Sequence, residues 1–321
     1  MGRLNDRLVT CQVAIWRCHK HLVPNGDQNR GPADGITNAS KDGVRTGRNL
    51  HTSAARVLIF LSPLVAATNV PQDQDHPRLA DIFQRQVDRK LELPENEQRR
   101  YADLLGEHLP AAERDTPQYV VLVDRNRFVQ AAMIFWIRPD RDFEFIGASP
   151  VSTGKPGQFE HFVTPTGVFK HGIENPDFRA EGTLNEFGIR GYGRKGMRVY
   201  DFGWQKAEKG WGGGGVGTLR LQMHATDPDR LASRLGTRQS EGCIRIPATL
   251  NTFIDEYGIL DGDYETAMDD GKTFWVLPKT RKATPWSGQF LVVVDSGRTR
   301  RPAWSPDPMS SKISRKRFRK P

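Results

Sequence analysis

From Pro117 onward the chain consists of short apolar runs separated by glycine and proline, and this pattern limits the fold more than any other feature. The first run, QYVVLVDRNRFVQAAMIFW, is rich in Val, Ile, Phe and Trp around a polar DRNR turn, which predicts a β-hairpin. Further short strands are expected in FEFIGASPVSTG, TPTGVFKHG, TFWVLP and FLVVVDS. The 31 Gly and 21 Pro residues fit a chain with many turns. We therefore predict a mainly β body.

One strand shows a clear alternation. In TLRLQMHAT, the apolar Leu219, Leu221 and Met223 alternate with polar residues, which is the period of a half-buried strand. His224 stands at the end of this strand, on the face opposite the apolar residues.

Helices are expected at two places. Residues 73–116 carry apolar side chains at spacings of three and four, with Pro94 opening the second stretch, and predict a helical preface. A short helix should begin with Pro247 at its first position and end at Gly258.

The ends of the chain differ from its middle. The run Val57–Ala67 is shorter than the roughly 20 apolar residues that span a bilayer, but it fits a secretory signal with cleavage near Ala67. A buried strand is the alternative. We expect residues 1–67 to be a leader from a start assigned too early plus a signal peptide, 68–116 the preface, 117–280 the main folded domain, and 281–321 a C-terminal extension with a basic tail. The mature protein would then be secreted, without an integral membrane span.

The net charge of +9 comes from these ends. Residues 1–67 hold nine Lys and Arg against four Asp and Glu, and residues 298–321 hold nine against one, so the body between them is mildly acidic. This distribution argues against a nucleic-acid partner for the body. The tail is read as a solvated end, with contact to an anionic surface as the alternative, and no protein partner is indicated.

Two glycine-rich stretches resemble nucleotide motifs only superficially. GYGRKG is followed by a strand-like MRVYDFGW rather than by a helix, and WGGGGVGT lacks the lysine of a phosphate-binding loop. Both are read as loops. The body shows no His or Cys pair at metal-ligand spacing, so we predict neither a metal nor a cofactor.

Cys243, in SEGCIRIP, would be the only cysteine left after removal of the leader. A single thiol in an oxidising compartment cannot form an intramolecular disulfide, and reactivity is one reason to keep it. His224 lies 19 residues earlier and can activate it, while the amides of Gly242 and Cys243 can stabilise an oxyanion. Arg245, on the same strand face, can hold a substrate carboxylate. On these residues alone, a nucleophile and a buried apolar filler remain equally open.

Four motifs in order decide between them. VSTGKP, TPTGVF, MHAT and SEGCIRIP closely resemble the catalytic domain of the L,D-transpeptidases, the YkuD type, over roughly residues 118–278. The resemblance implies a β-sandwich acting on peptidoglycan stem peptides. It assigns Cys243 as nucleophile, His224 as base oriented by the Ala225 carbonyl, and Gly242 with Cys243 as oxyanion donors; Ser240 and Arg245 match substrate-binding positions.

One residue departs from the family pattern. Many members carry a second His where this chain has Glu241. We expect its carboxylate to face solvent; holding His224 or Arg245 in place is the alternative. Near the sulfur, it would raise the pKa of the thiol.

The reaction implied is a two-step acyl transfer. Cys243 attacks the third stem residue of a tetrapeptide, expels the terminal D-Ala and passes the acyl group to an amine, which forms a 3-3 cross-link or attaches a protein and contributes to peptidoglycan biosynthesis, cell-wall organisation and cell shape. Loops at GYGRKG and WGGGG are expected to form a lid. The alternatives are an L,D-carboxypeptidase or amide hydrolase on the same domain, and an inactive peptidoglycan-binding module.

Overall fold

The computed structural model describes residues 76–138, 140 and 142–305. The expected leader with its signal sequence, Cys11 and Cys18, and most of the basic tail lie outside these residues.

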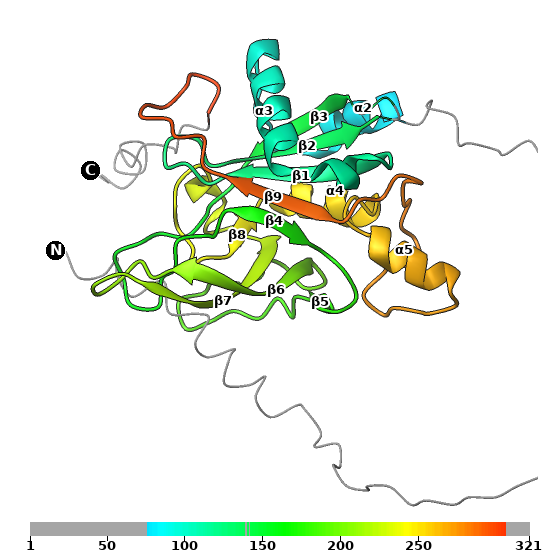
Figure 1. Cartoon of the computed structure of the whole chain (residues 1–321). Helices are drawn as coiled ribbons and strands as arrows, with labels where there is room; N and C mark the ends of the chain where they lie inside the picture. Colours follow the sequence, from blue (N-terminus) through cyan, green and yellow to red (C-terminus); the bar gives the residue numbers. More distant parts are fainter. Residues whose placement is uncertain (1–75, 139, 141, 306–321) are drawn as a thin grey trace, which may run out of the picture. The chain divides into compact units, whose positions relative to one another are not determined.

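Two mixed β-sheets form the body, which confirms the mainly β, sandwich-like prediction (Figure 1). Sheet A has the strand order β3 (Phe143–Pro150), β2 (Ala131–Ile137), β1 (Gln118–Asp124), β9 (Phe290–Val294) and β4 (Gly167–Lys170). Sheet B has the order β5 (Phe178–Arg179), β6 (Arg198–Glu208), β7 (Val216–Ala225) and β8 (Ile244–Ile246). Only the pairs β1–β9 and β7–β8 are parallel among these strands. The predicted hairpin is β1–β2, with Gln118 opposite Ile137.

The helices predicted in the preface and after Pro247 are present, and the structure adds elements that the sequence did not predict. The preface forms α2 (His76–Gln86), α3 (Glu95–His108) and a 3-10 turn at Ala111–Arg114. The helix after Cys243 is α4 (Ala248–Glu256), followed by α5 (Gly262–Asp269), and a further 3-10 turn spans Ala232–Arg234. Pro247 is the N-cap of α4 rather than its first residue, and Gly258 follows its end with φ of +60°. No helix in the described part of the chain is long and apolar enough to cross a membrane.

Sheet A is buried on both faces. Every residue of β1, β2 and β9 is buried. One face packs on α3 through Tyr101 and Leu105, and the other packs on α2, α4 and sheet B. Strands covered on both sides read as continuous apolar runs, which explains why QYVVLV and FLVVV show no alternation.

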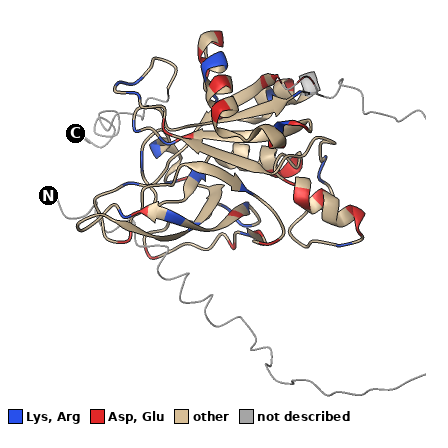
Figure 2. Cartoon of the chain, in the orientation of Figure 1, with Lys and Arg blue, Asp and Glu red and all other residues tan. Residues whose placement is uncertain are grey.

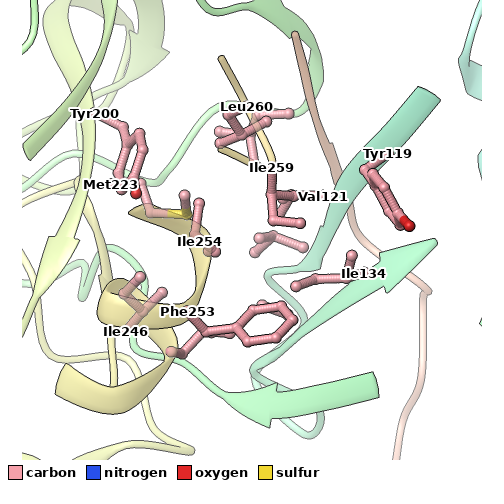
Figure 3. Close-up of a cluster of buried hydrophobic side chains, with 14 of the residues drawn as sticks. Tyr119, Val121, Ile134, Tyr200, Met223, Ile246, Phe253, Ile254, Ile259 and Leu260 are labelled. Carbon is pink, nitrogen blue, oxygen red and sulfur yellow. The ribbon is translucent and has the colours of Figure 1, made fainter. Parts of the chain in front are cut away.

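The core between the sheets lies directly beneath the strand that follows Cys243. Ile246 of β8 and Phe253 and Ile254 of α4 contact the same cluster as Val121 and Ile134 of sheet A (Figure 3). The segment before β8 is therefore attached to the most rigid part of the molecule.

The C-terminal part of the body differs from expectation at two points. TFWVLP, residues 273–278, forms no strand: Val276 and Leu277 pack on Tyr264, the Val276 carbonyl accepts a hydrogen bond from Arg179 Nε at 2.8 Å, and Trp275 is 75% exposed. The run thus buries part of its apolar surface against α5 without a partner strand. By contrast, β9 lies between β1 and β4, so the segment after residue 280 supplies an inner strand of sheet A.

Gly147 of β3 tests how the preface is attached. An added Cβ at Gly147 would lie 2.3 Å from the ring of Phe83, which is fully buried. We expect Gly147→Ala to push Phe83 away and lower the free energy of unfolding by about 1–3 kcal/mol in urea titration. Gly213→Ala is the matched control, because nothing lies within 4 Å of its Cβ position. Equal stability of the two variants would contradict the docking of α2 through Phe83.

Candidate active site

A tight turn, Ser240–Cys243, precedes β8, and we call it the nucleophile loop. The Ser240 hydroxyl donates to the Cys243 carbonyl at 2.5 Å and accepts from the Gly242 amide at 3.2 Å. Gly242 has φ of +132°, and an added Cβ would lie 2.7 Å from Leu219. No other residue type fits this turn without strain.

Strand pairing brings the two chemical groups together. β7 pairs with β8 in parallel, with Met223 opposite Ile244 and His224 opposite Arg245. The 19-residue connection therefore returns to the neighbouring strand, as predicted. Cys243 directly precedes Ile244 and is 2% exposed, and its Sγ lies 3.9 Å from the Arg220 carbonyl oxygen.

His224 has a defined tautomer. Its Nδ1 lies 2.9 Å from the Ala225 carbonyl oxygen, the contact expected from the sequence. A carbonyl only accepts hydrogen bonds, so Nδ1 carries the proton and Nε2 presents a lone pair. The buried Nε2 has no hydrogen-bond partner among the described residues, so the thiol is not hydrogen-bonded to it in this structure.

Burial keeps His224 neutral. Loss of hydration lowers its pKa to about 3, the charge of Arg245 acts in the same direction, and the bond to Ala225 opposes both. The imidazole is therefore neutral at physiological pH and its Nε2 lone pair is open, while the low pKa makes it a weak base in the resting site.

Arg245 is the shared electrostatic neighbour of the site. Its Nη1 donates to the Gln239 carbonyl at 3.2 Å. Its positive charge helps to lower the pKa of His224 and of the buried His161, and it also favours the ionised form of Glu241. Its expected role toward a substrate carboxylate remains a proposal.

Glu241 is buried, so the expectation that it faces solvent is wrong. The residue is 8% exposed. Its backbone carbonyl accepts a hydrogen bond from the Phe162 amide at 3.1 Å, which attaches the nucleophile loop to a segment nearly 80 residues earlier. Burial raises the pKa of its carboxyl to about 7; Arg245 opposes this rise and Glu160 adds to it.

The groups of Ser240 and Gly242 that were expected to contact substrate already form hydrogen bonds within the nucleophile loop. Ser240, expected at the substrate, is fully buried and holds the nucleophile loop. The Gly242 amide, expected as an oxyanion donor, already points to the Ser240 hydroxyl. An oxyanion would share that amide with Ser240.

Sequence reasoning missed three neighbours of the site. Thr164 accepts from the Gly154 amide at 2.8 Å and donates to the Gly242 carbonyl at 2.7 Å. His161 is buried, with Nδ1 3.1 Å from the Lys155 carbonyl. The Tyr192 ring packs edge-on against His224 at 4.7 Å. Tyr192 belongs to GYGRKG, which forms turns before β6, as predicted.

The fold and the site define a class: a β-sandwich domain that presents a cysteine beside a neutral histidine. Residues 118–258 match the family model of the L,D-transpeptidase catalytic domain, YkuD. This match confirms the resemblance seen in the sequence and supports an activity of the L,D-transpeptidase type on peptidoglycan.

Among solved structures, the chain is similar to a crystal structure of a mutant of the helical cell shape determining protein Pgp2 from Campylobacter jejuni. The identity is 14% and the TM-score is 0.24, over 60% of this chain and 51% of that chain. The match thus spans about half of that protein, and a likeness at this level adds nothing to the assignment. No curated protein matches the chain.

Burial of Glu241 predicts a pH-dependent cost. The unfolded carboxyl ionises near 4.5 and the folded one near 7, so the folded protein holds more protons between these values and loses stability as pH rises through them. We expect Glu241→Gln to gain roughly 3 kcal/mol in unfolding free energy relative to the parent between about pH 4 and pH 8.

Chemical denaturation at the two pH values measures this gain. Glu107→Gln, on the exposed side of α3, is the matched control and should show no such dependence. If the difference in unfolding free energy between Glu241→Gln and the parent does not change with pH, the Glu241 carboxyl is hydrated and the prediction is wrong.

Proposed function

We propose that the domain is an L,D-transpeptidase that acts on peptidoglycan stem tetrapeptides through a thioester on Cys243. The observation that carries the proposal is the neutral His224, whose Nδ1 is fixed by Ala225 and whose Nε2 is open. Its parallel-strand neighbour is the segment that carries the cysteine.

In the first step, the Cys243 sulfur attacks the carbonyl carbon of the third stem residue while its proton moves to His224 Nε2. The negative charge develops on the carbonyl oxygen, where the Cys243 amide and the Gly242 amide are the candidate donors. Collapse breaks the amide bond, and the leaving D-Ala amine takes the proton from His224. The sulfur must approach Nε2 for this transfer, and such contacts often tighten only when substrate binds.

In the second step, an amine attacks the thioester carbon and gives its proton to His224. The new amide bond forms as the sulfur leaves and regains a proton, so the enzyme returns to its starting state. Tyr192 covers one side of His224, which fits a role of the GYGRKG loop in keeping water from the thioester. Water in place of the amine would make the enzyme an L,D-carboxypeptidase.

The substrate places the protein in the cell envelope. Peptidoglycan lies outside the cytoplasmic membrane, so the domain must be exported to reach it. Secretion through the N-terminal signal and action in the periplasm are part of the proposal. So is the division into a leader, a helical preface and a catalytic domain from residue 117, which includes β9 and therefore extends past residue 280. Detection of the mature N-terminus near residue 68 by mass spectrometry of exported protein would support it.

Incubation with a carbapenem, followed by mass measurement, tests for a live nucleophile. We expect one covalent adduct on the parent and none on Cys243→Ala. His224→Ala should slow adduct formation by roughly 100-fold or more, because it removes the proton acceptor. No adduct with the parent, or an equal adduct with Cys243→Ala, would contradict the proposal and favour an inert binding module.

Product analysis with disaccharide tetrapeptides then separates transfer from hydrolysis. The proposed transpeptidase yields cross-linked dimers and free D-Ala. Release of D-Ala with tripeptide as the sole other product would identify a carboxypeptidase instead.

The low pKa of His224 also predicts the pH profile. Carbapenem acylation should show no inflection between about pH 5.5 and pH 7, because the imidazole stays neutral throughout. The rates are best measured on Glu241→Gln, which removes the carboxyl that titrates near 7. An inflection near 6.5 in that variant, lost when His224 is replaced, would show an ordinary hydrated imidazole.

A further inference from the structure

A pocket of about 440 Å³ lies beside the 154–164 loop. The hairpin that joins β6 to β7 forms one wall with Lys209 and Trp211, and Arg125 and Arg238 form another. Pro156 of the 154–164 loop also lines the pocket. We call this the basic pocket.

Positive charge exceeds negative charge in the basic pocket. Arg125, Lys209 and Arg238 line it, against Glu208. Asp295 is shared by two arginines, at 3.7 Å from Arg125 Nε and 4.0 Å from Arg238 Nη2. Elsewhere the described elements carry both signs intermixed (Figure 2).

The arginines repel one another as well. Burial lowers the pKa of Arg238, and the charges of Arg125 and Arg127 lower it further, against the opposing effects of Asp295 and Asp124. The pKa of Arg238 is lowered despite these two carboxylates, and a bound anion would relieve the repulsion among the arginines.

An aromatic wall gives the pocket a second character. The Trp211 ring packs edge-on against Phe162 with centroids 4.8 Å apart, and Lys209 Nζ lies 5.9 Å from the Trp211 centroid. Next to it, the exposed glycines 212–215 have nothing within 4 Å of their Cβ positions. The rim of the pocket beside Trp211 is therefore uncrowded and exposed to solvent.

The 154–164 loop links the pocket to the nucleophile loop. The Lys155 amide donates to the Ser240 carbonyl at 2.8 Å, and the Phe162 amide donates to the Glu241 carbonyl. On its other side, the same loop bonds to the β6–β7 hairpin, with the Gly157 amide 2.6 Å from the Gly210 carbonyl. The 154–164 loop therefore connects the basic pocket directly with the loop that carries Cys243.

We propose that the basic pocket binds a carboxylate of an acidic stem peptide, with Lys209 and Arg238 as the principal contacts and Trp211 as the packing surface. Arginine and lysine pair with carboxylates by charge-assisted hydrogen bonds, which are stronger than those between neutral groups. This inference rests on the proposed function, because it takes the reacting peptides as the source of the carboxylate. The donor and the acceptor stem share this chemistry.

Calorimetric titration tests the proposal in the Cys243→Ala background, where no acyl-enzyme forms. The probes are a disaccharide tetrapeptide and a disaccharide tripeptide, each also with its carboxylates amidated. We expect Lys209→Gln and Arg238→Gln each to weaken binding of the unmodified tetrapeptide by roughly tenfold or more. Amidation should reduce binding similarly and remove the difference between variants. If the variants also bind the tripeptide more weakly, the pocket can hold the acceptor stem as well as the donor stem. If only binding of the tetrapeptide is weakened, the pocket is assigned to the donor stem.

Arg99→Gln is the matched control, since its side chain is 72% exposed on α3 and the charge change is equal. It should leave binding within about twofold. Lys209 is partly exposed and lies over the Trp211 ring. Because its replacement perturbs folding less than that of a buried residue, Lys209→Gln still tests the proposal if Arg238→Gln fails to fold. Equal binding in all variants, equal losses in the control, undiminished binding of amidated probes, or no binding by the Cys243→Ala parent would each overturn the proposal.

The carbapenem adduct on unsubstituted Cys243 separates this failure from that of the proposed function. An adduct together with unchanged binding in Lys209→Gln and Arg238→Gln would contradict the pocket proposal and support Cys243 as the nucleophile. Carboxylate-dependent binding at Lys209 and Arg238 without an adduct would contradict the proposed acyl transfer and support the pocket proposal.

Discussion

The parallel pairing of β7 with β8 is the interaction on which the site depends. Only this register places His224 beside Arg245 and brings the cysteine that precedes Ile244 against the same strand. A shift by one residue would turn the His224 side chain to the other face of the sheet. The buried Leu221 and Met223 oppose such a shift, because it would move them out of the core.

Burial explains most of the electrostatics around this pairing. The same loss of hydration lowers the pKa of His224 and raises that of Glu241, and Arg245 lies in the electrostatic range of both. A neutral histidine beside a thiol favours transfer of the proton during attack rather than a standing ion pair. Above neutral pH the Glu241 carboxyl carries a negative charge, which the positive charge of Arg245 favours and the negative charge of Glu160 opposes.

Local patterns predicted much of this arrangement. The hairpin of β1 and β2, the strand ending at His224 and the helix after Pro247 each follow from residues close in sequence. The burial of Glu241 could not be predicted from neighbouring residues, because the nucleophile loop is bonded to a segment distant in sequence, with the Phe162 amide on the Glu241 carbonyl. Likewise, an apolar run such as 273–278 shows no partner in its own sequence, whereas the equally apolar β9 finds two, β1 and β4. Long-range pairing, not composition, separates these two runs.

The most direct test of the account is the protonation state of His224 itself. Nitrogen-15 NMR of histidine-labelled protein, assigned with His224→Gln, reports the two ring nitrogens separately. The account predicts a neutral ring protonated at Nδ1 throughout about pH 4.5 to 8, since its pKa is lowered to about 3 and Ala225 fixes the tautomer. A His224 signal that titrates near 6.5, or a neutral ring protonated at Nε2, would contradict it.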